Sequence, residues 1–473
     1  MSLTQLHPQL QHDKATMGEY ILDSDEIQAS TTFGKPFLKE FLIDPSYRNL
    51  NHASYGGIPR HIRDALRSYQ DQTEARPDPF IRFTYNEHLK ESRQAAADLL
   101  NAPLSTVVFV PNATVGINTV LRNLAWNPDA RDEILYFNTI YGACGKTIDY
   151  IVDTRNGLIS HRGITLTYPL EDEEIIAQFR AAVAASKAAG KRPRLCVFDV
   201  VSSLPGVRFP FEAMTAACRE LGVTSLVDGA QGIGMIPIDL TALDPDYFFT
   251  NCHKWLHAPR GSAVFYVPER NQHLMASTVP TSHGYVPRSG APRFNPLPAS
   301  AESHFVANFG YVGTLDNSPY LCVKDAIEWR KSIGGEDKII EYTWTLARAG
   351  GERAAAVLGT FIMENKAGTM TKCSLVNVAL PMVMSEHAET PSTGPDGTVT
   401  VPEGLAYPIV DWMVETLVQE YQTFVALFWH NGRWYMRLSA QVYLDEEDFE
   451  WAGHILKELC RRVGNQEYRP KTG

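Results

Sequence analysis

The sequence predicts an α/β protein with a large domain built on a mostly parallel sheet and a smaller C-terminal α+β domain. Apolar strand-like runs alternate with helical patterns from about Arg48 to Asn271, as is typical of parallel α/β sheets. Polar residues follow several of these runs, at the sheet edge where ligands bind in open α/β folds. With 473 residues the chain is too long for one compact core. We therefore expect an N-terminal arm over 1–45, a large domain over 46–316 and a small domain over 317–473.

Each element of the large domain is predicted from its own pattern. Helices are indicated by apolar residues at helical spacing, and strands by short runs rich in β-branched and aromatic residues. In chain order we expect a helix over 87–101, strands over 106–110 and 133–137, a helix over 174–189, a strand over 195–201, a helix over 211–221, and strands over 224–227 and 246–249. Residues 277–310 are rich in Pro, Gly, Ser and Asn, which predicts a long surface excursion.

The small domain is predicted to open with a helix and to end with a hairpin and a helix. The expected elements are helices over 321–333 and 408–421, strands over 424–428 and 433–438, and a last helix that begins near Asp445. His430-Asn431-Gly432 between the two strands is a hairpin turn signal. Acidic residues at the start of the last helix and basic residues near its end suit the helix dipole.

Composition excludes several classes of partner. The chain has 54 acidic and 43 basic residues, and a net charge of −11 argues against a general nucleic-acid surface. No apolar run approaches the roughly 20 residues that cross a bilayer, and the polar N-terminus lacks a signal-peptide core. Seven cysteines without CxxC spacing indicate reduced thiols. We expect a cytoplasmic protein with neither nucleic-acid nor membrane partners.

Two residues at strand ends point to pyridoxal phosphate (PLP) chemistry. Asp228 ends the apolar run 224–227, and Lys254 follows the run 246–249. A lysine amine can form a Schiff base with the cofactor's aldehyde, and a carboxylate can keep the pyridine nitrogen protonated so that the ring accepts electrons. Burial would lower the lysine pKa and leave a neutral amine that can remove a proton. The alternatives, a turn aspartate and a surface lysine, explain each residue singly but not their order and setting.

Several neighbouring residues are candidates for holding such a cofactor. Pro111 to Gly116 lies between a strand and a helix, so backbone N–H groups and the Thr114 hydroxyl could cradle a phosphate, although an ordinary capped turn is an equal alternative. Asn251 and His253 flank the lysine and could bond the phosphate or orient the amine; His253 could instead be a core histidine.

Other candidates would face the cofactor ring or the substrate. Gln231 and Ser202 could serve the phenolate oxygen of the cofactor. Tyr141, in a Gly-rich loop after the strand over 133–137, could stack on the pyridine ring, or simply pack as a loop tyrosine. Arg437 has the planar guanidinium that suits an α-carboxylate, although most arginines in such a setting are structural.

The cysteines argue against desulfurase chemistry. A cysteine desulfurase needs a mobile, exposed thiol in the second half of the chain. Cys322 falls in a helical pattern and Cys373 beside a strand-like run, so neither suits this role.

Taken together, the motifs resemble those of the class V aminotransferase group of fold-type I PLP-dependent transferases, over nearly all of the chain beyond about residue 45. Within that group they are similar to the branch of isopenicillin N epimerases and fungal hercynylcysteine sulfoxide lyases. In Asn51-His52-Ala53-Ser54-Tyr55-Gly56, Ala53 and Tyr55 stand where those lyases have Gly and Phe. The other matching motifs are Asn112-Ala113-Thr114, Ile140-Tyr141-Gly142-Ala143-Cys144-Gly145, Asp228-Gly229-Ala230-Gln231-Gly232, His253-Lys254-Trp255-Leu256, Val312-Gly313-Thr314-Leu315-Asp316 and Arg437-Leu438-Ser439-Ala440-Gln441-Val442-Tyr443.

The resemblance implies a role for each candidate residue. Lys254 would carry the cofactor, Asp228 would hold its ring nitrogen, and Tyr141 would stack on the ring and act at the leaving group. The remaining roles are implied as follows: Gln231 and Ser202 at the phenolate oxygen; Ala113, Thr114, Asn251 and His253 at the phosphate; Thr314 reaching the phosphate from a second subunit; and Asn51, His52 and Arg437 at the substrate, with no metal ion.

The resemblance also implies an activity. We expect a homodimeric PLP-dependent C–S lyase that converts hercynylcysteine sulfoxide by β-elimination to pyruvate, ammonia and a sulfenate, with ergothioneine formed after reduction. One alternative in the same family is γ-elimination with ring closure, as in the loline pathway; others are amino-acid epimerisation and transamination. A non-catalytic binding module is the alternative from a different class, and the joint presence of Lys254, Asp228 and Gln231 argues against it.

Overall fold

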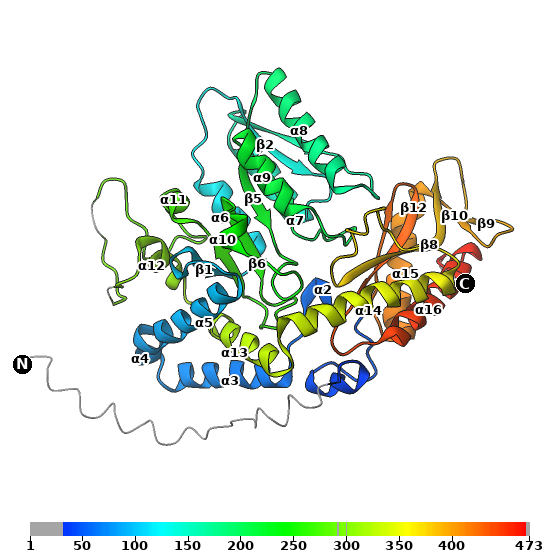
Figure 1. Cartoon of the computed structure of the whole chain (residues 1–473), viewed down its shortest axis with the longest axis horizontal. Helices are drawn as coiled ribbons and strands as arrows, with labels where there is room; N and C mark the ends of the chain where they lie inside the picture. The colour runs from blue at the N-terminus through cyan, green and yellow to red at the C-terminus, as the bar shows by residue number, and fades with distance from the viewer. Residues whose placement is uncertain (1–31, 291–292, 299, 470–473) are drawn as a thin grey trace, which may run out of the picture.

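The computed structural model describes residues 32–290, 293–298 and 300–469, which form two β-sheets surrounded by helices (Figure 1). The predicted arm lies outside the described residues as far as position 31. From there the chain forms a short helix, η3 (Lys35–Glu40), and packs Phe41 against Tyr443 with ring centroids 4.7 Å apart. The domain boundaries at 45 and 316 stay predictions.

The larger sheet has seven strands in the order β1-β7-β6-β5-β4-β2-β3. Neighbouring strands are parallel except that β7 runs antiparallel to both β1 and β6. The mostly parallel sheet that the sequence predicts is therefore confirmed. The strand bounds are β1 (Val107–Val110), β2 (Asp132–Phe137), β3 (Ile159–Ile164), β4 (Arg192–Asp199), β5 (Thr224–Asp228), β6 (Tyr247–Asn251) and β7 (Ala263–Tyr266).

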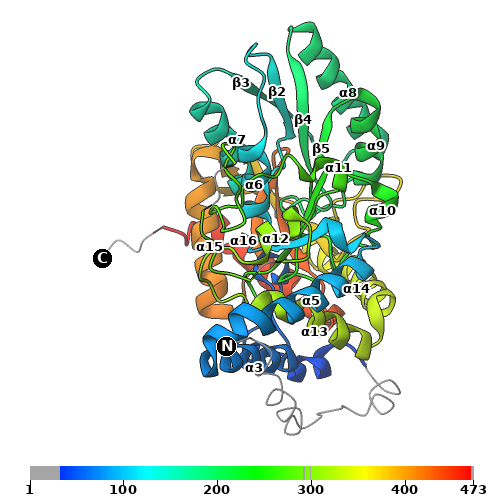
Figure 2. The same cartoon turned by 90° about the vertical axis from the view of Figure 1, so that its left-hand side faces the viewer.

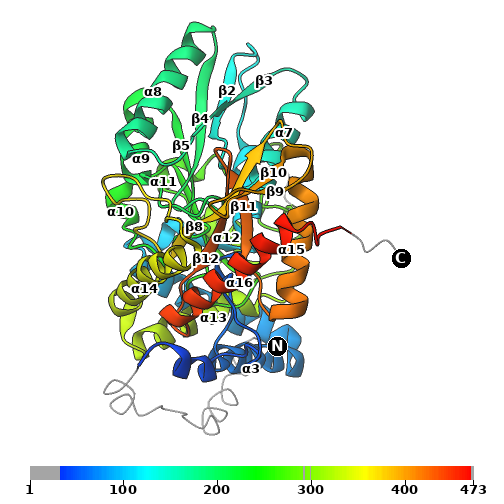
Figure 3. The same ribbon diagram turned by 90° about the vertical axis from the view of Figure 1, so that its right-hand side faces the viewer.

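Helices cover both faces of this sheet because its strands are apolar on both sides. Successive side chains of a strand point to opposite faces. In β1, Val108 and Val110 pack with α6 (Ala113–Asn123) and α7 (Gly142–Thr154), whereas Phe109 belongs to the core formed with the helices of the other face. Figures 2 and 3 show α7 on one side of the strands and α8 and α9 on the other. The helices of that other face are α5 (Tyr85–Leu99), α8 (Asp172–Ala188) and α9 (Phe211–Leu221).

The smaller sheet has five strands in the order β11-β12-β8-β10-β9. The hairpin between β11 and β12 confirms the predicted turn: Asn431 and Gly432 have φ of 48° and 72°, and His430 pairs with Arg433. The bounds are β8 (Leu375–Ser385), β9 (Ser392–Thr393), β10 (Val399–Pro402), β11 (Ala426–His430), β12 (Arg433–Ser439), α14 (Gly335–Leu358), α15 (Ala406–Tyr421) and α16 (Glu446–Gly464).

The sequence pattern did not predict α14, a helix of 24 residues that packs along α16. Gly350 and Gly351 interrupt its pattern and weaken helix propensity. Their small size is needed here, because a Cβ at Gly350 would lie 2.5 Å from the Phe449 ring. The excursion over 277–310 also differs from the prediction, since its last part forms α12 (His304–Gly310) against β1.

The remaining helices are short or lie at the base of the large sheet: α2 (His52–Tyr55), α3 (Arg60–Ala75), α4 (Pro77–Pro79), η4 (Phe80–Thr84), η5 (Leu104–Thr106), α10 (Leu240–Leu243), α11 (Glu269–Gln272), α13 (Ser318–Ser332) and η6 (Glu403–Leu405). No helix in the described part of the chain is long and apolar enough to cross a membrane.

Candidate active site

The carboxyl ends of three neighbouring parallel strands bring acidic and amide side chains to one edge of the large sheet. Asn251 ends β6, Asp228 ends β5 and Asp199 ends β4, and Asp199 is paired with Asp228 in the strand register. All three residues are buried. The predicted strand-end positions of Asp228 and Asn251 are thus confirmed, and Asp199 is an additional carboxylate that the sequence did not single out.

Lys254 lies in the turn that directly follows β6. The pKa of its amine is lowered to about 8, mainly by burial and in smaller part by the charge of Arg437, whereas the Asp228 carboxylate opposes the shift. A substantial share of the amine is therefore neutral near pH 8, and a neutral amine is what nucleophilic attack on a carbonyl requires.

A chain of hydrogen bonds that runs through His52 holds the turn that carries Lys254. The His52 Nε2–H donates to the Lys254 carbonyl over 2.7 Å, so His52 Nδ1 accepts from the Tyr443 hydroxyl over 2.9 Å. The Asn49 amide donates in turn to the Tyr443 hydroxyl. Burial lowers the pKa of His52 to about 4, which keeps the ring neutral.

These hydrogen bonds bear on the expected role of His52 at the substrate, which stays a prediction. The His52 side chain is buried, and both ring nitrogens are engaged within the protein. His52 therefore positions the backbone of Lys254. The two segments also approach closely at Gly56, which has φ +66°, and where a Cβ would lie 1.7 Å from the His253 carbonyl oxygen.

Arg330 is a second residue that holds the segment around Lys254. It donates to the Trp255 carbonyl over 2.7 Å and to the Gly234 carbonyl over 2.9 Å, and it forms a two-point ion pair with Glu336. The sequence pattern could not single out Arg330, because it lies in an ordinary helix some 70 residues after Lys254 in the chain.

Asp228 is held by two donors. Its Oδ1 accepts from the Ala230 N–H over 2.9 Å, and its Oδ2 lies 3.6 Å from the Cys144 sulfur on α7. Burial raises the pKa of the Asp228 carboxyl, while these donors and Lys254 oppose the shift. Burial and the neighbouring Asp228 raise the pKa of Asp199 well above its ordinary value.

The side chains of Gln231 and Ser202 both form hydrogen bonds to other groups of the protein. The Gln231 amide donates to the Ala53 carbonyl over 3.1 Å and accepts from the Trp255 indole over 2.7 Å, which leaves one N–H. The Ser202 hydroxyl donates to the Pro205 carbonyl over 2.6 Å. Their expected roles at the cofactor's phenolate oxygen stay predictions.

The first turn of α6 is tied to the end of β6. Asn112 caps the helix by accepting from the Val115 N–H over 2.9 Å, and Asn251 accepts from the Ala113 N–H over 3.0 Å. Thr114, on the same turn, carries an N–H that the helix itself cannot pair and a hydroxyl beside it. A helix N-terminus of this kind favours a phosphate.

His253 completes this corner. Its Nδ1 donates to the Ser262 carbonyl over 3.3 Å, which directs Nε2 away from that contact. Burial and the neighbouring Lys254 lower the pKa of His253 to about 4, so the ring is neutral. The structure therefore brings His253 and Asn251 to the same strand end, and their contact with a phosphate stays a prediction.

Arg437 is a fully buried guanidinium without an anionic partner among the described residues. It donates to the Ser203 carbonyl over 2.7 Å, to Asn51 Oδ1 over 2.6 Å and to the Ser54 hydroxyl over 3.1 Å. Its Nε has no hydrogen-bond partner in the described part of the chain. Burial lowers the pKa of Arg437 to about 10.

Tyr141 and Thr314 are both exposed in a single chain. Tyr141 precedes α7, and half of its side chain is accessible. Thr314 lies in the exposed segment between α12 and α13. Their expected contacts with a cofactor stay predictions.

The cysteines fit the expectation that none is an exposed nucleophile in the second half of the chain. All seven are buried free thiols. Cys322 lies in α13 and Cys373 just before β8, and both are inaccessible. Burial raises the pKa of each thiol.

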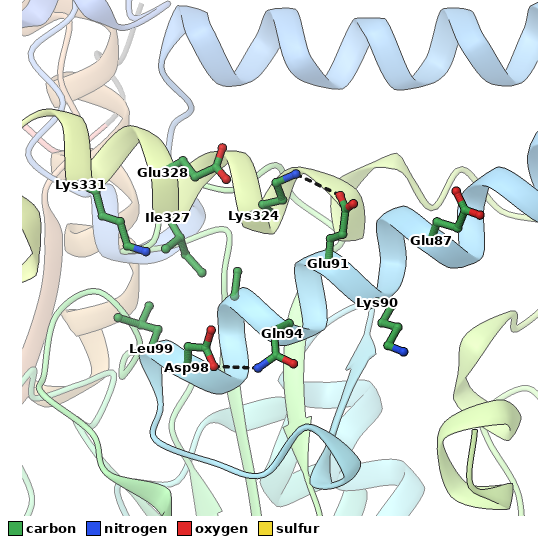
Figure 4. A pocket seen from close by; sticks show the side chains of 11 residues that line it. Glu87, Lys90, Glu91, Gln94, Asp98, Leu99, Lys324, Ile327, Glu328 and Lys331 are labelled. Atoms are coloured by element: carbon green, nitrogen blue, oxygen red, sulfur yellow. Dashed lines mark hydrogen bonds and ion pairs between the residues drawn. The ribbon is translucent and has the colours of Figure 1, made fainter. Parts of the chain in front are cut away.

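A groove of about 1050 Å³ between α5 and α13 lies apart from the strand-end residues (Figure 4). Polar and charged side chains along it contact one another: Lys324 forms an ion pair with Glu91 over 3.0 Å, and the Gln94 amide donates to Asp98 over 2.7 Å. None of the strand-end residues contributes to the groove, so it is not the catalytic site.

The strand-end residues fit pyridoxal phosphate. A buried lysine with a lowered pKa suits its aldehyde, a buried carboxylate suits its ring nitrogen, and the N-terminus of α6 suits its phosphate. The unpaired guanidinium of Arg437 suits the carboxylate of an amino acid bound beside it.

Comparison with known proteins gives a consistent result. Residues 58–286 match the family model described as aminotransferase class V. The chain is 38% identical to the L-cysteine desulfhydrase-like protein lolT1 of Epichloe uncinata, over 92% of this chain and 97% of the relative. It is 29% identical to the hercynylcysteine sulfoxide lyase of Schizosaccharomyces pombe, over 91% and 99% of the two chains. A solved complex of the cystine C–S lyase C-DES with cysteine persulfide has the same fold, with a TM-score of 0.65, 20% identity and coverage of 90% and 99%.

Proposed function

We propose that this chain, which belongs to the aminotransferase class V family, is a pyridoxal-phosphate-dependent C–S lyase that acts on an S-conjugate of cysteine. The observation that carries the proposal is the buried guanidinium of Arg437, which has no anion within the described protein. A buried cation is costly unless it is paired, so the site is built to receive a carboxylate. Lys254, a partly neutral amine, lies close enough to Arg437 that the charge of the guanidinium lowers the pKa of the amine.

Each residue of the site then has a defined task. When bound, the cofactor supplies an electron sink for the charge left at Cα. Lys254 Nζ would hold the cofactor and, as a partly neutral amine, would remove the Cα proton of the substrate. Asp228 holds the proton on the ring nitrogen, and the first turn of α6 holds the phosphate. Arg437 binds the α-carboxylate, and Tyr141 donates a hydrogen bond or a proton at the leaving group.

The substrate that we propose is hercynylcysteine sulfoxide. The Cβ–S bond breaks, sulfur leaves with the electron pair as a sulfenate, and the three-carbon fragment hydrolyses to pyruvate and ammonia. Reduction of the sulfenate by a cellular thiol then gives ergothioneine. The similarity to the Schizosaccharomyces pombe lyase over 91% of this chain supports this substrate.

A second candidate is the elimination of hydrogen sulfide from L-cysteine. The higher identity, 38%, to the L-cysteine desulfhydrase-like protein of Epichloe uncinata favours it. Both reactions use the same bond cleavage and release pyruvate, and they differ in the sulfur product. γ-Elimination with ring closure, epimerisation and transamination release no pyruvate from these substrates.

The proposed enzyme is a homodimer with shared active sites. Three large apolar side chains near the site segments are exposed in the single chain: Tyr55, Tyr141 and Leu315. Large exposed apolar side chains are often covered by a partner surface. Thr314, next to Leu315, is free to reach a partner's phosphate. Light scattering after size-exclusion chromatography should give twice the chain mass of 52.8 kDa.

The deciding experiment measures pyruvate released from hercynylcysteine sulfoxide by the PLP-loaded protein, beside sulfide released from L-cysteine. A Lys254→Ala variant is the control. Lys254-dependent pyruvate with ergothioneine, and slow sulfide release, supports the proposed substrate. Fast sulfide release instead supports the desulfhydrase. A cofactor-loaded protein that makes neither product contradicts the lyase proposal.

A further inference from the structure

Two buried carboxylates, Asp199 and Asp228, lie side by side at the end of the site that would hold the ring nitrogen of the proposed cofactor. Asp199 and Asp228 are register partners on β4 and β5, so their side chains leave the sheet at the same level. Both are buried, and Lys254 is the cation that acts on both. Two like charges in one buried site cannot both be stable, so the pair holds one charge and one proton.

The hydrogen bonds around the pair are unequal. Asp228 accepts from the Ala230 N–H and from the Cys144 thiol, one donor to each oxygen. Among the described residues no group donates to the Asp199 carboxylate. Hydrogen bonds to a carboxylate favour its charged form, so the donors decide which member of the pair is ionised.

We propose that Cys144 is a positioning residue that assigns the negative charge of the aspartate pair to Asp228 and thereby keeps the ring nitrogen of the bound cofactor protonated. The inference rests on the proposed function, because it concerns the cofactor that this function requires. When the pKa of Asp228 is lower, the proton shared with the cofactor stays on the ring nitrogen. A protonated ring nitrogen makes the cofactor a stronger electron sink.

The setting of Cys144 excludes a more reactive role. Its side chain is inaccessible, and burial together with the adjacent Asp228 raises the pKa of the thiol, so the sulfur stays protonated and able to donate. It lies on the first turn of α7, where its N–H donates to the Tyr141 carbonyl over 2.8 Å. The thiol and the expected stacking residue are thus fixed by the same turn.

The test uses holoenzyme loaded with PLP that is labelled with ¹⁵N at the ring nitrogen, because the ¹⁵N chemical shift reports protonation directly. In the unsubstituted protein the resonance is expected at the position of a protonated pyridine. In Cys144→Ala it should move toward the unprotonated position, and exchange of the substrate's Cα hydrogen should slow about tenfold. Cys373→Ala removes another inaccessible thiol, one near backbone carbonyls, and should change neither readout.

Two further variants separate charge assignment from packing. Cys144→Ser keeps a donor and should return the resonance toward that of the unsubstituted protein. Asp199→Asn leaves Asp228 as the sole carboxylate, so the double variant with Cys144→Ala should regain a protonated ring nitrogen. A resonance that Cys144→Ala leaves unmoved, or that Asp199→Asn does not restore, overturns the role of Cys144 while pyruvate release continues. If the unsubstituted holoenzyme shows a protonated ring nitrogen that Cys144→Ala shifts, but releases no pyruvate, the proposed substrate is wrong and the role of Cys144 stands.

Discussion

Arg437 donates from Nη2 to Asn51 Oδ1 over 2.6 Å, and this contact joins residues that are 386 positions apart in the chain. Asn51 belongs to the segment that also supports the Lys254 turn, whereas Arg437 lies on β12 of the smaller sheet. The group proposed to bind the substrate carboxylate and the group proposed to remove its Cα proton are therefore fixed through one short segment.

Replacing Arg437 with Met should reduce activity without reducing stability. Loss of the guanidinium removes the proposed carboxylate contact, so kcat/KM should fall by about 10² to 10³. The Tm of the apoprotein should change little, because the gain from removing a buried unpaired cation is offset by the loss of its hydrogen bonds to Ser203, Asn51 and Ser54. Arg433→Met, on the same strand but partly exposed, is the matched control for kinetics and calorimetry. An unchanged kcat/KM contradicts the assignment.

Gly206→Ala should disturb the proposed contact between Arg437 and the substrate carboxylate, because Gly206 packs against the Arg437 side chain. A Cβ at Gly206 would lie 2.8 Å from Arg437 Cδ and 2.9 Å from Leu375. The guanidinium must then shift, and we expect KM for the amino-acid substrate to rise about tenfold, the effect of losing about 1.4 kcal/mol of binding. Gly404→Ala, where a Cβ meets open space, should leave KM unchanged. Equal KM values in the two variants would show that Arg437 tolerates the shift.

His52 should make the protein less stable as the pH falls from 6.5 to 4. Its folded pKa is lowered to about 4, so in this window the unfolded chain binds the extra proton and the free energy of unfolding decreases by about 3 kcal/mol. Urea unfolding across this range should show the loss, and His52→Gln should make it smaller by about 3 kcal/mol, because buried His253 contributes a loss of its own. His61→Gln, at an exposed position on α3, should retain it. A His52→Gln curve that parallels the unsubstituted protein contradicts the neutral, buried state of the ring.

Uptake of PLP by the apoprotein should follow the titration of Lys254. The neutral amine is the reacting form, so the rate of cofactor binding should reach half its maximum near pH 8. Asp228 raises the pKa of Lys254, so Asp228→Asn should move that midpoint to lower pH. Stopped-flow absorbance gives both midpoints. A midpoint near pH 10.5, or one that Asp228→Asn moves upward, would refute this account of the lysine.

Sequence patterns were sufficient for the residues that end regular strands. Asp228 and Asn251 close apolar runs, and the parallel sheet places such ends at one edge. Asp199 was missed because Val200 and Val201 continue its apolar run, which extended the predicted strand beyond its true end. Cys144 was predicted to lie in a Gly-rich loop, so its place on α7 beside Asp228 was missed.

The supporting residues could not be predicted because their contacts are distant in sequence. His52 reaches the Lys254 carbonyl across 202 positions, and Tyr443 reaches His52 across 391. No local pattern encodes such a pairing. The motif that contains His52 predicts a position near the site, and only the structure shows that both of its ring nitrogens bond to protein groups.

The dependence of the Lys254 turn on Tyr443 has a consequence for biosynthesis. The ribosome completes the seven-stranded sheet and Lys254 long before it adds Tyr443, and domains commonly begin to fold from the N-terminal side during translation. Until the last part of the chain emerges, His52 lacks the Tyr443 hydroxyl that orients its ring, and its hydrogen bond to the Lys254 carbonyl is not yet fixed. Productive cofactor loading is therefore an event of the finished polypeptide, and C-terminal truncations should yield chains that fold in part yet remain colourless.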